Sequence, residues 1–192
     1  MTVVTIYTDA SIYRGVGSWA TVILRAGNDL VELSGKLRGS FQSSTAVEGA
    51  AIANALWHAR RAGLIEPGDD VTVRSDNLSI VQRIAQARAG FPWRDARDPD
   101  IMRAVESVLT TVGAVDVQVR FRWVKGHQRL DSDDPHMIYN RRCDDLAGAA
   151  RKGERVTGFD VLVAKVAAAR ARRAAGQGSR VERELWAREA QA

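Results

Sequence analysis

The order of strand-like and helix-like segments is the feature of this sequence that most constrains its fold. Segments rich in β-branched residues predict strands, and Ala-rich segments with apolar residues at helical spacing predict helices. The predicted strands cover residues 3–8, 16–25, 30–37, 71–75 and 115–123, and the predicted helices cover residues 45–62, 77–88, 99–112, 140–152 and 159–175. Three strands come first, and helices separate the later strands, so the sequence predicts an α/β fold with a mixed sheet flanked by helices.

The composition predicts one folded domain with an appendage. The 192 residues are 45% hydrophobic and 27% charged, as in ordinary globular proteins. Residues 151–192 contain ten Lys/Arg and five Asp/Glu, and they carry the whole net charge of +5. We therefore predict a main domain over residues 1–152 and a basic, Ala/Arg-rich helical extension over residues 153–192. The arginines of this extension (Arg170, Arg172 and Arg173) suit a polyanionic or protein partner, although a solvated helix face has a similar composition.

The sequence also bears on the compartment. No stretch approaches the roughly 18 consecutive apolar residues of a membrane span. The chain opens directly into a strand-like segment without a basic, hydrophobic leader. Cys143 is the only cysteine, which excludes an intrachain disulfide and suits a reducing compartment. We expect a cytoplasmic protein with no membrane contact.

Four acidic residues stand where predicted elements begin or end. Asp9 follows the first strand and Asp76 follows the fourth, while Glu48 begins the first helix and Asp144 begins the helix after the last strand. Ligand sites in open α/β sheets favour the carboxyl ends of the strands. The four carboxylates are therefore expected to converge at one edge of the sheet.

Each acid taken alone has an ordinary structural explanation. Glu48 follows Thr45 at the spacing of a capping box, Asp76 suits a helix N-cap, and Asp144 suits the helix dipole. Four carboxylates within a few ångström would, however, raise one another's pKa unless cations neutralised them. Oxygen ligands favour hard ions, so we predict a site for two Mg²⁺ ions, with Mn²⁺ as a substitute, that stabilise the attacking and leaving oxygens of a phosphodiester.

Five ordered motifs carry a resemblance to a known family. They are Thr8-Asp9-Ala10-Ser11, Ala46-Val47-Glu48-Gly49-Ala50-Ala51, Ser75-Asp76-Asn77, Trp123-Val124-Lys125-Gly126-His127 and Asn140-Arg141-Arg142-Cys143-Asp144-Asp145-Leu146-Ala147. Together they resemble the motifs of the ribonuclease HI family over about residues 3–150. The resemblance implies a ribonuclease H-like fold with a five-stranded mixed sheet. It also implies a metal-dependent endonuclease that hydrolyses the RNA strand of RNA–DNA hybrids.

The resemblance implies roles for the acidic residues. Asp9 would contact both metal ions, and Glu48 and Asp76 would complete the site at the leaving 3′-oxygen. Asp144 would help to hold the ion that activates water. Asp145 is the rival of Asp144, and the Cys–Asp pairing of the family favours Asp144.

Polar residues around the acids are candidates for proton transfer and substrate binding. By the resemblance, His127 would assist proton movement or product departure, and a plain surface histidine is the alternative. His58 and His136 are expected to be ordinary surface residues, because no Cys/His spacing supports zinc. The candidate nucleic-acid contacts are Ser11, Ser43, Ser44, Thr45, Asn77, Trp93 and Arg94. Helix capping is the alternative for Ser44 and Thr45.

The chain departs from the family pattern at several positions that hold no metal ligand. Ala10 replaces the usual glycine, residues 12–17 replace a Gly-rich turn, and Leu130–Asp134 lengthen the loop before the last helix. Two rival functions stay open, namely a nuclease of the same fold that acts on DNA or DNA junctions, and a non-catalytic nucleic-acid-binding module. We expect a monomer whose partner is the RNA–DNA hybrid.

Overall fold

The fold is a five-stranded mixed sheet with helices on both faces, as predicted. The computed structural model describes residues 2–27, 30–91, 98–115, 117–156 and 158–175. The strands are β1 (Val3–Tyr13), β2 (Val16–Arg25), β3 (Val31–Lys36), β4 (Asp70–Ser75) and β5 (Gln118–Trp123), in the sheet order β3-β2-β1-β4-β5. The helices are α1 (Ser44–Arg61), α2 (Leu78–Arg88), α3 (Pro99–Val115), α4 (Met137–Lys152) and α5 (Phe159–Ala174). Strand β1 is antiparallel to β2 and parallel to β4, which makes the sheet mixed.

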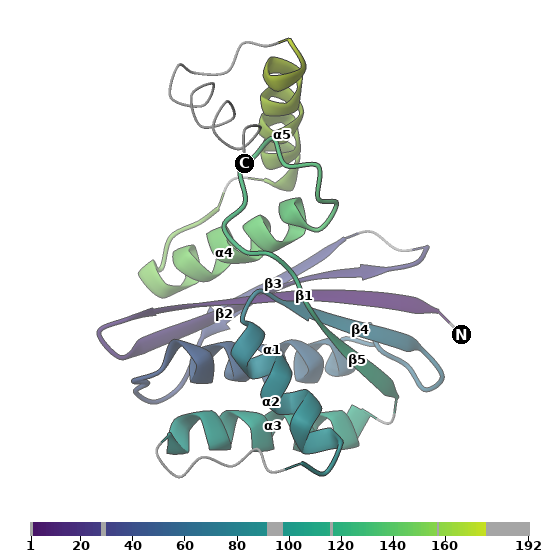
Figure 1. Ribbon diagram of the computed structural model, residues 1–192, viewed down its shortest axis with the longest axis vertical. Helices are drawn as coiled ribbons and strands as arrows, with labels where there is room; N and C mark the ends of the chain where they lie inside the picture. The colour runs from purple at the N-terminus through teal and green to yellow at the C-terminus, as the bar shows by residue number, and fades with distance from the viewer. Residues whose placement is uncertain (1, 28–29, 92–97, 116, 157, 176–192) are drawn as a thin grey trace, which may run out of the picture.

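Among the described residues, the layers are built around one large hydrophobic core and two smaller clusters. Helix α1 packs on one face of the sheet with α3 outside it, while α4 covers the other face and α5 lies beyond α4 (Figure 1). The larger core lies on the α1 side and includes Ile6, Ile52 and Val73. Gly49 permits the close approach of α1 to its neighbours, because a Cβ atom there would lie 2.8 Å from the Cβ atom of Ala104.

Strand β1 is longer than the sequence predicted. It continues past Thr8 to Tyr13 because it pairs with β2 over its whole length, up to the pair Tyr13–Val16. Arg14 and Gly15 both have positive φ angles, 49° and 80°, as a two-residue hairpin turn requires. Asp9 therefore lies inside a strand and not at its end. The pairing of β1 with β4 nevertheless stops at Thr8–Ser75, so Asp9 and Asp76 both follow the last paired residues.

Three predicted boundaries between α3 and α4 were also wrong. Val115 is the final residue of α3, where it is buried, and β5 begins only at Gln118. The buried positions of α3 (Ile101, Ala104, Val105, Val108 and Val115) keep helical spacing, which explains why the apolar run belongs to the helix. Helix α4 begins at Met137, three residues earlier than predicted.

The extension begins where α4 ends. Gly153 caps α4 in the left-handed conformation, and α5 is the helical part of the extension within the described residues. Among the residues that the structure describes, no helix is long and apolar enough to cross a membrane. Cys143 is a free, buried cysteine on α4.

Candidate active site

Three of the predicted carboxylates form a compact cluster. Asp9 of β1, Glu48 of α1 and Asp76 after β4 each offer one oxygen atom, and these three oxygens lie within 4.8 Å of one another. Asp9 and Glu48 are almost fully buried, with 5% and 8% of their surface exposed. Three acidic side chains have thus been brought from separate elements into one place with little water to screen them.

The electrostatics of the cluster are unfavourable without a counter-charge. Burial, followed by the negative charge of Asp76, raises the pKa of Asp9 to about 7. Burial, followed by the charge of Asp9, raises the pKa of Glu48 well above its usual range. Oε2 of Glu48 is buried without a hydrogen-bond partner. A bound cation would satisfy this oxygen and offset the repulsion.

The structure removes the capping explanations for Glu48 and Asp76. The N-cap of α1 is Ser43, whose hydroxyl accepts a hydrogen bond from the amide of Ala46 at 3.3 Å. Glu48 is therefore too far along α1 to complete a capping box with Thr45. The N-cap of α2 is Asn77, whose Oδ1 accepts from the amide of Ile80 at 3.1 Å. The side chain of Asp76 is left to face the cluster.

Asp144 lies next to the cluster and not within it. Its negative charge contributes to the raised pKa of Asp9. It also lines a small pocket with Asp76, His127 and Asn140. Asp145 is occupied elsewhere, because it forms an ion pair with Arg141 at 3.4 Å. The geometry therefore favours Asp144 over Asp145 as the fourth carboxylate.

Comparison with known families settles which family contains this arrangement. A sequence model of the RNase H family matches residues 1–152. The chain belongs to the RNase H family. A sequence search of curated proteins gives no match.

Solved RNase H structures have the same fold. RNase H1 from the halophilic archaeon Halobacterium salinarum is 19% identical and has a TM-score of 0.59, with 79% of this chain and 98% of that chain covered. LC11-RNase H1, isolated from compost and solved in complex with an RNA/DNA hybrid, is 21% identical with a TM-score of 0.58, and 78% of this chain and 97% of that chain are covered. The N-terminal RNase H domain of a Mycobacterium tuberculosis protein is 16% identical with a TM-score of 0.57, covering 80% and 96%. Helix α5 lies beyond the part matched by the RNase H family model.

His127 lies beside the acidic cluster. It is exposed and lines the pocket that contains Asp76 and Asp144. Its φ angle of 48° places a non-glycine residue in the left-handed region, which costs about 1–2 kcal/mol and requires support from the surrounding structure. Gly126 before it lies against Asp76, because a Cβ atom there would be 2.9 Å from Cγ of that residue.

The predicted nucleic-acid contacts that the structure describes lie on β1 and at the starts of α1 and α2. Ser44 is exposed and Thr45 is half-buried on the first turn of α1, while Ser43 and Asn77 act as helix caps. The hydroxyl of Ser11 on β1 accepts a hydrogen bond from Nε of Arg151 at 2.9 Å, so it is tied to the end of α4. Trp93 and Arg94 lie outside the described residues.

Several residues of the RNase H domain have contacts that the sequence did not predict. Asn140 is buried on α4 and donates from Nδ2 to Oδ2 of Asp76 at 3.2 Å, so it orients one member of the cluster. The only sequence signal for it was its place at the start of the last motif. His136 and His58 are half-buried, contrary to the prediction of surface residues. His136 is hydrogen-bonded through Nδ1 to the hydroxyl of Tyr7 at 2.7 Å, and the ring of His58 stacks on Trp19.

Proposed function

We propose that this protein is an endonuclease that hydrolyses the RNA strand of RNA–DNA hybrids with the help of two divalent cations. The observation that carries the proposal is the buried cluster of Asp9, Glu48 and Asp76, in which Oε2 of Glu48 is without a partner. Membership of the RNase H family supports the reaction class. The LC11-RNase H1 structure, solved with an RNA/DNA hybrid, supports the substrate.

The acidic residues would hold Mg²⁺, or Mn²⁺ as a substitute. Asp9 would contact both ions, Glu48 and Asp76 would complete the site on the side of the leaving 3′-oxygen, and Asp144 would complete the site on the side of the attacking water. The oxygen-only donor set fits hard divalent cations. When bound, the cations would neutralise the phosphate and lower the pKa of water. The protein's own part would be to hold four carboxylates on, or directly after, rigid strands and helices before the substrate arrives.

Other side chains would serve the proton and the substrate. His127 lies beside the pocket of Asp76 and Asp144, where it would accept or deliver a proton or ease product departure. Ser11, Ser43, Ser44, Thr45 and Asn77 would contact the hybrid, with 2′-hydroxyl groups of the RNA strand as the feature that distinguishes it from DNA. Trp93 and Arg94 would add contacts from the segment between α2 and α3.

The deciding experiment is cleavage of matched RNA–DNA, RNA–RNA and DNA–DNA duplexes. We expect cutting of the hybrid with Mg²⁺ and none with EDTA. An Asp76→Asn variant should lose cleavage, while the matched control Asp145→Asn, which removes a nearby carboxylate outside the cluster, should keep it. Equal cutting of DNA–DNA would establish a DNA nuclease instead, and binding of the hybrid without cutting would establish a non-catalytic module.

Three further statements stay predictions. They are the division into a catalytic domain over residues 1–152 and an extension over residues 153–192, the monomeric state, and the cytoplasmic location. Light scattering after size-exclusion chromatography tests the monomeric state, and fractionation of the source cells tests the cytoplasmic location. Limited proteolysis tests the division into a catalytic domain and an extension. This division predicts that a protease cuts between Gly153 and Gly158.

A further inference from the structure

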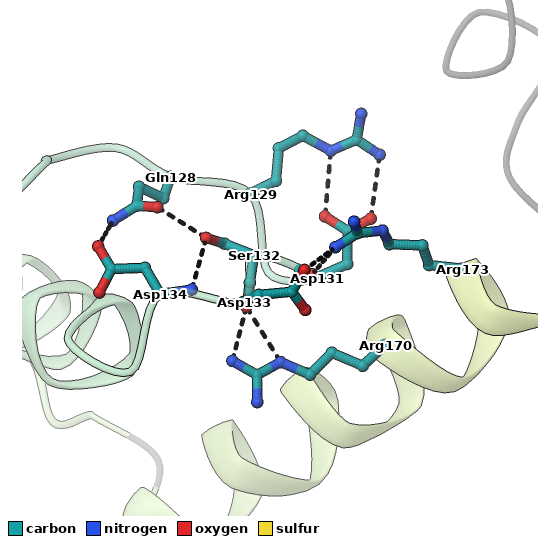
Figure 2. A network of polar contacts seen from close by, with 8 residues as sticks. All are labelled: Gln128, Arg129, Asp131, Ser132, Asp133, Asp134, Arg170 and Arg173. Atoms are coloured by element: carbon teal, nitrogen blue, oxygen red, sulfur yellow. Dashed lines mark hydrogen bonds and ion pairs between the residues drawn. The ribbon is translucent and has the colours of Figure 1, made fainter. Parts of the chain in front are cut away.

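Helix α5 of the extension docks onto the loop that carries His127. This loop, called here the His127 loop, comprises residues 124–136 between β5 and α4. Figure 2 shows two arginines of α5, Arg170 and Arg173, pointing into the loop from one side of the helix. The contact joins residues about 40 positions apart in the sequence, since Arg170 and Ser132 are separated by 38.

The two arginines hold the backbone of the loop. Arg170 donates from Nε and Nη2 to the carbonyl oxygen of Ser132, at 3.1 and 2.6 Å. Arg173 donates from Nη1 to the carbonyl oxygen of Asp131 at 2.9 Å and forms an ion pair with Asp133 at 3.0 Å. Hydrogen bonds from charged donors are the stronger kind. The tip of the loop is therefore fixed by four interactions from one helix.

Side chains inside the loop carry this restraint toward His127. The hydroxyl of Ser132 donates to Oε1 of Gln128 at 2.7 Å. Nε2 of Gln128 donates to Oδ2 of Asp134 at 2.6 Å and to the carbonyl oxygen of Lys125 at 3.0 Å. Figure 2 shows these contacts of Gln128 with Ser132 and Asp134. Gln128 directly follows His127 in the sequence, so its side chain links the residues held by α5 to the neighbour of the histidine.

Apolar contacts anchor the same helix nearer its N-terminus than the two arginines. Leu162 and Val166 of α5 are buried against Met137, the first residue of α4, with Leu130 of the His127 loop packed alongside. Helix α4 also carries Asp144. The extension is therefore attached both to the loop and to the helix that complete the active site.

The place of the contact is informative. Arg170 and Arg173 contact Asp131, Ser132 and Asp133, which lie in the middle of the His127 loop. A longer polar loop has more conformational entropy to lose. His127 in addition has a left-handed backbone conformation that its surroundings must maintain. Helix α5, which lies outside the matched family domain, supplies restraints to this polar loop.

We infer that α5 is a brace for the His127 loop and that Arg170 and Arg173 are positioning residues for His127. The inference rests on the proposed role of His127 in hydrolysis. It assigns the arginines of the extension to the protein's own loop, in place of the phosphate groups of a nucleic acid. Arg172 is the internal comparison, because it lies between them in sequence, is exposed, and makes no hydrogen bond or ion pair with the loop within the described residues.

The test is a set of substitutions in the full chain, assayed on an RNA–DNA hybrid with Mg²⁺. We expect Arg170→Met with Arg173→Met to lower kcat about 10-fold with KM within about twofold, short of the ~100-fold that a misplacement of 1 Å can cost. Arg172→Met, which removes the same charge, should change neither value. Arg170→Lys should recover part of kcat, because lysine can still donate to the Ser132 carbonyl group.

A cycle with His127→Ala identifies the route of the effect. In that background the double arginine variant should lower kcat no further, since the residue that it positions is gone. An undiminished loss in the His127→Ala background would overturn the inference. The inference would also be overturned if KM rose by more than about twofold, and equally, in Arg172→Met and in the double variant. That result would indicate that the extension contacts phosphate groups.

Hydrogen exchange separates this inference from the proposed function. The double variant should exchange the amides of residues 124–136 faster while those of β1 and β4 stay protected. Unchanged exchange in the loop would overturn the brace. A second outcome is that the unsubstituted protein does not cut the hybrid although the double variant exchanges the loop amides faster. This outcome would refute the proposed function and the positioning of a catalytic His127, but the contact between α5 and the loop would stand. If the double variant does not fold, Arg173→Met alone gives the same readouts.

Discussion

Replacement of Asp9 by asparagine should stabilise the metal-free protein at pH 8 and abolish hydrolysis. Asp9 is 5% exposed, and burial and Asp76 raise its pKa from 3.8 to about 7. The folded state therefore binds a proton at Asp9 more tightly than the unfolded state does. The contribution of Asp9 to the free energy of unfolding therefore falls as the pH rises from about 4 to about 7. Above pH 7 the folded protein bears the full destabilisation caused by the ionised Asp9.

The size of the gain follows from this shift. One pKa unit corresponds to about 1.4 kcal/mol, so a rise from 3.8 to about 7 limits the gain to about 4 kcal/mol. Asparagine is nearly isosteric, and its Oδ1 can still accept from the amide of Ala10, as Asp9 does at 2.7 Å. An amide cannot reproduce every contact of the carboxyl group, so we expect a gain of about 2 kcal/mol in the free energy of unfolding. For a chain of this size, that gain raises Tm by roughly 4–8 °C.

The assay is thermal unfolding of both proteins in EDTA at pH 8 and pH 4, followed by circular dichroism. The gain should be present at pH 8 and nearly absent at pH 4, where the folded wild-type Asp9 is already protonated. Mg²⁺ should raise the Tm of the wild type more than that of the variant. Asp145→Asn, a half-buried carboxylate paired with Arg141, is the control and should give no gain. Equal gains at both pH values, or none at pH 8, would refute the electrostatic reasoning.

Three shorter predictions concern the same site. Asp144→Asn should lower kcat on the hybrid at least about 100-fold while the Tm in EDTA does not fall, because Asp144 adds to the repulsion at Asp9; normal activity would remove it from the site. Gly126→Ala should lower activity with little loss of Tm, because its Cβ atom would displace the carboxylate of Asp76, and kinetics with unfolding curves test this. Cys143 is fully buried and burial raises the pKa of its thiol, so a thiol reagent should react only after denaturant is added; rapid labelling of the folded protein would contradict this burial.

Most of the fold could be predicted because local patterns were consistent with it. The β-branched strands and the Ala-rich α1 indicated their own conformations, and the order of these elements along the chain indicated a mixed sheet. The length of β1 could not be predicted in the same way. Residues Ser11–Tyr13 are in a strand because β2 pairs with them across the hairpin, and such pairing depends on a partner that local propensity does not contain.

The acidic cluster could be predicted from the strand topology, but the residues of α4 that contact the cluster and its surroundings could not. Asp9 and Asp76 directly follow Thr8 and Ser75, the last residues that pair between β1 and β4. The topology therefore brings them together once these two strands are known to be neighbours. Asn140 and Arg151 reach Asp76 and Ser11 from α4. Their contacts depend on how a helix is rotated over the sheet, and that rotation is set by the packing of residues such as Cys143 and Leu146 against Tyr7.

The docking of α5 marks the limit of what the sequence could predict. Arg170, Arg172 and Arg173 are alike in composition, and a run of arginines on a helix suits water, phosphate or a protein surface equally. At 3.6 residues per turn, positions 170 and 173 share a face of the helix and position 172 is rotated away from 173 by about 100°. Helical geometry therefore predicts that two of the three act together, but not on what. The answer comes from the loop, whose carbonyl groups at Asp131 and Ser132 need donors. An arginine bound to such carbonyl groups has fewer free N–H groups with which to bind a phosphate.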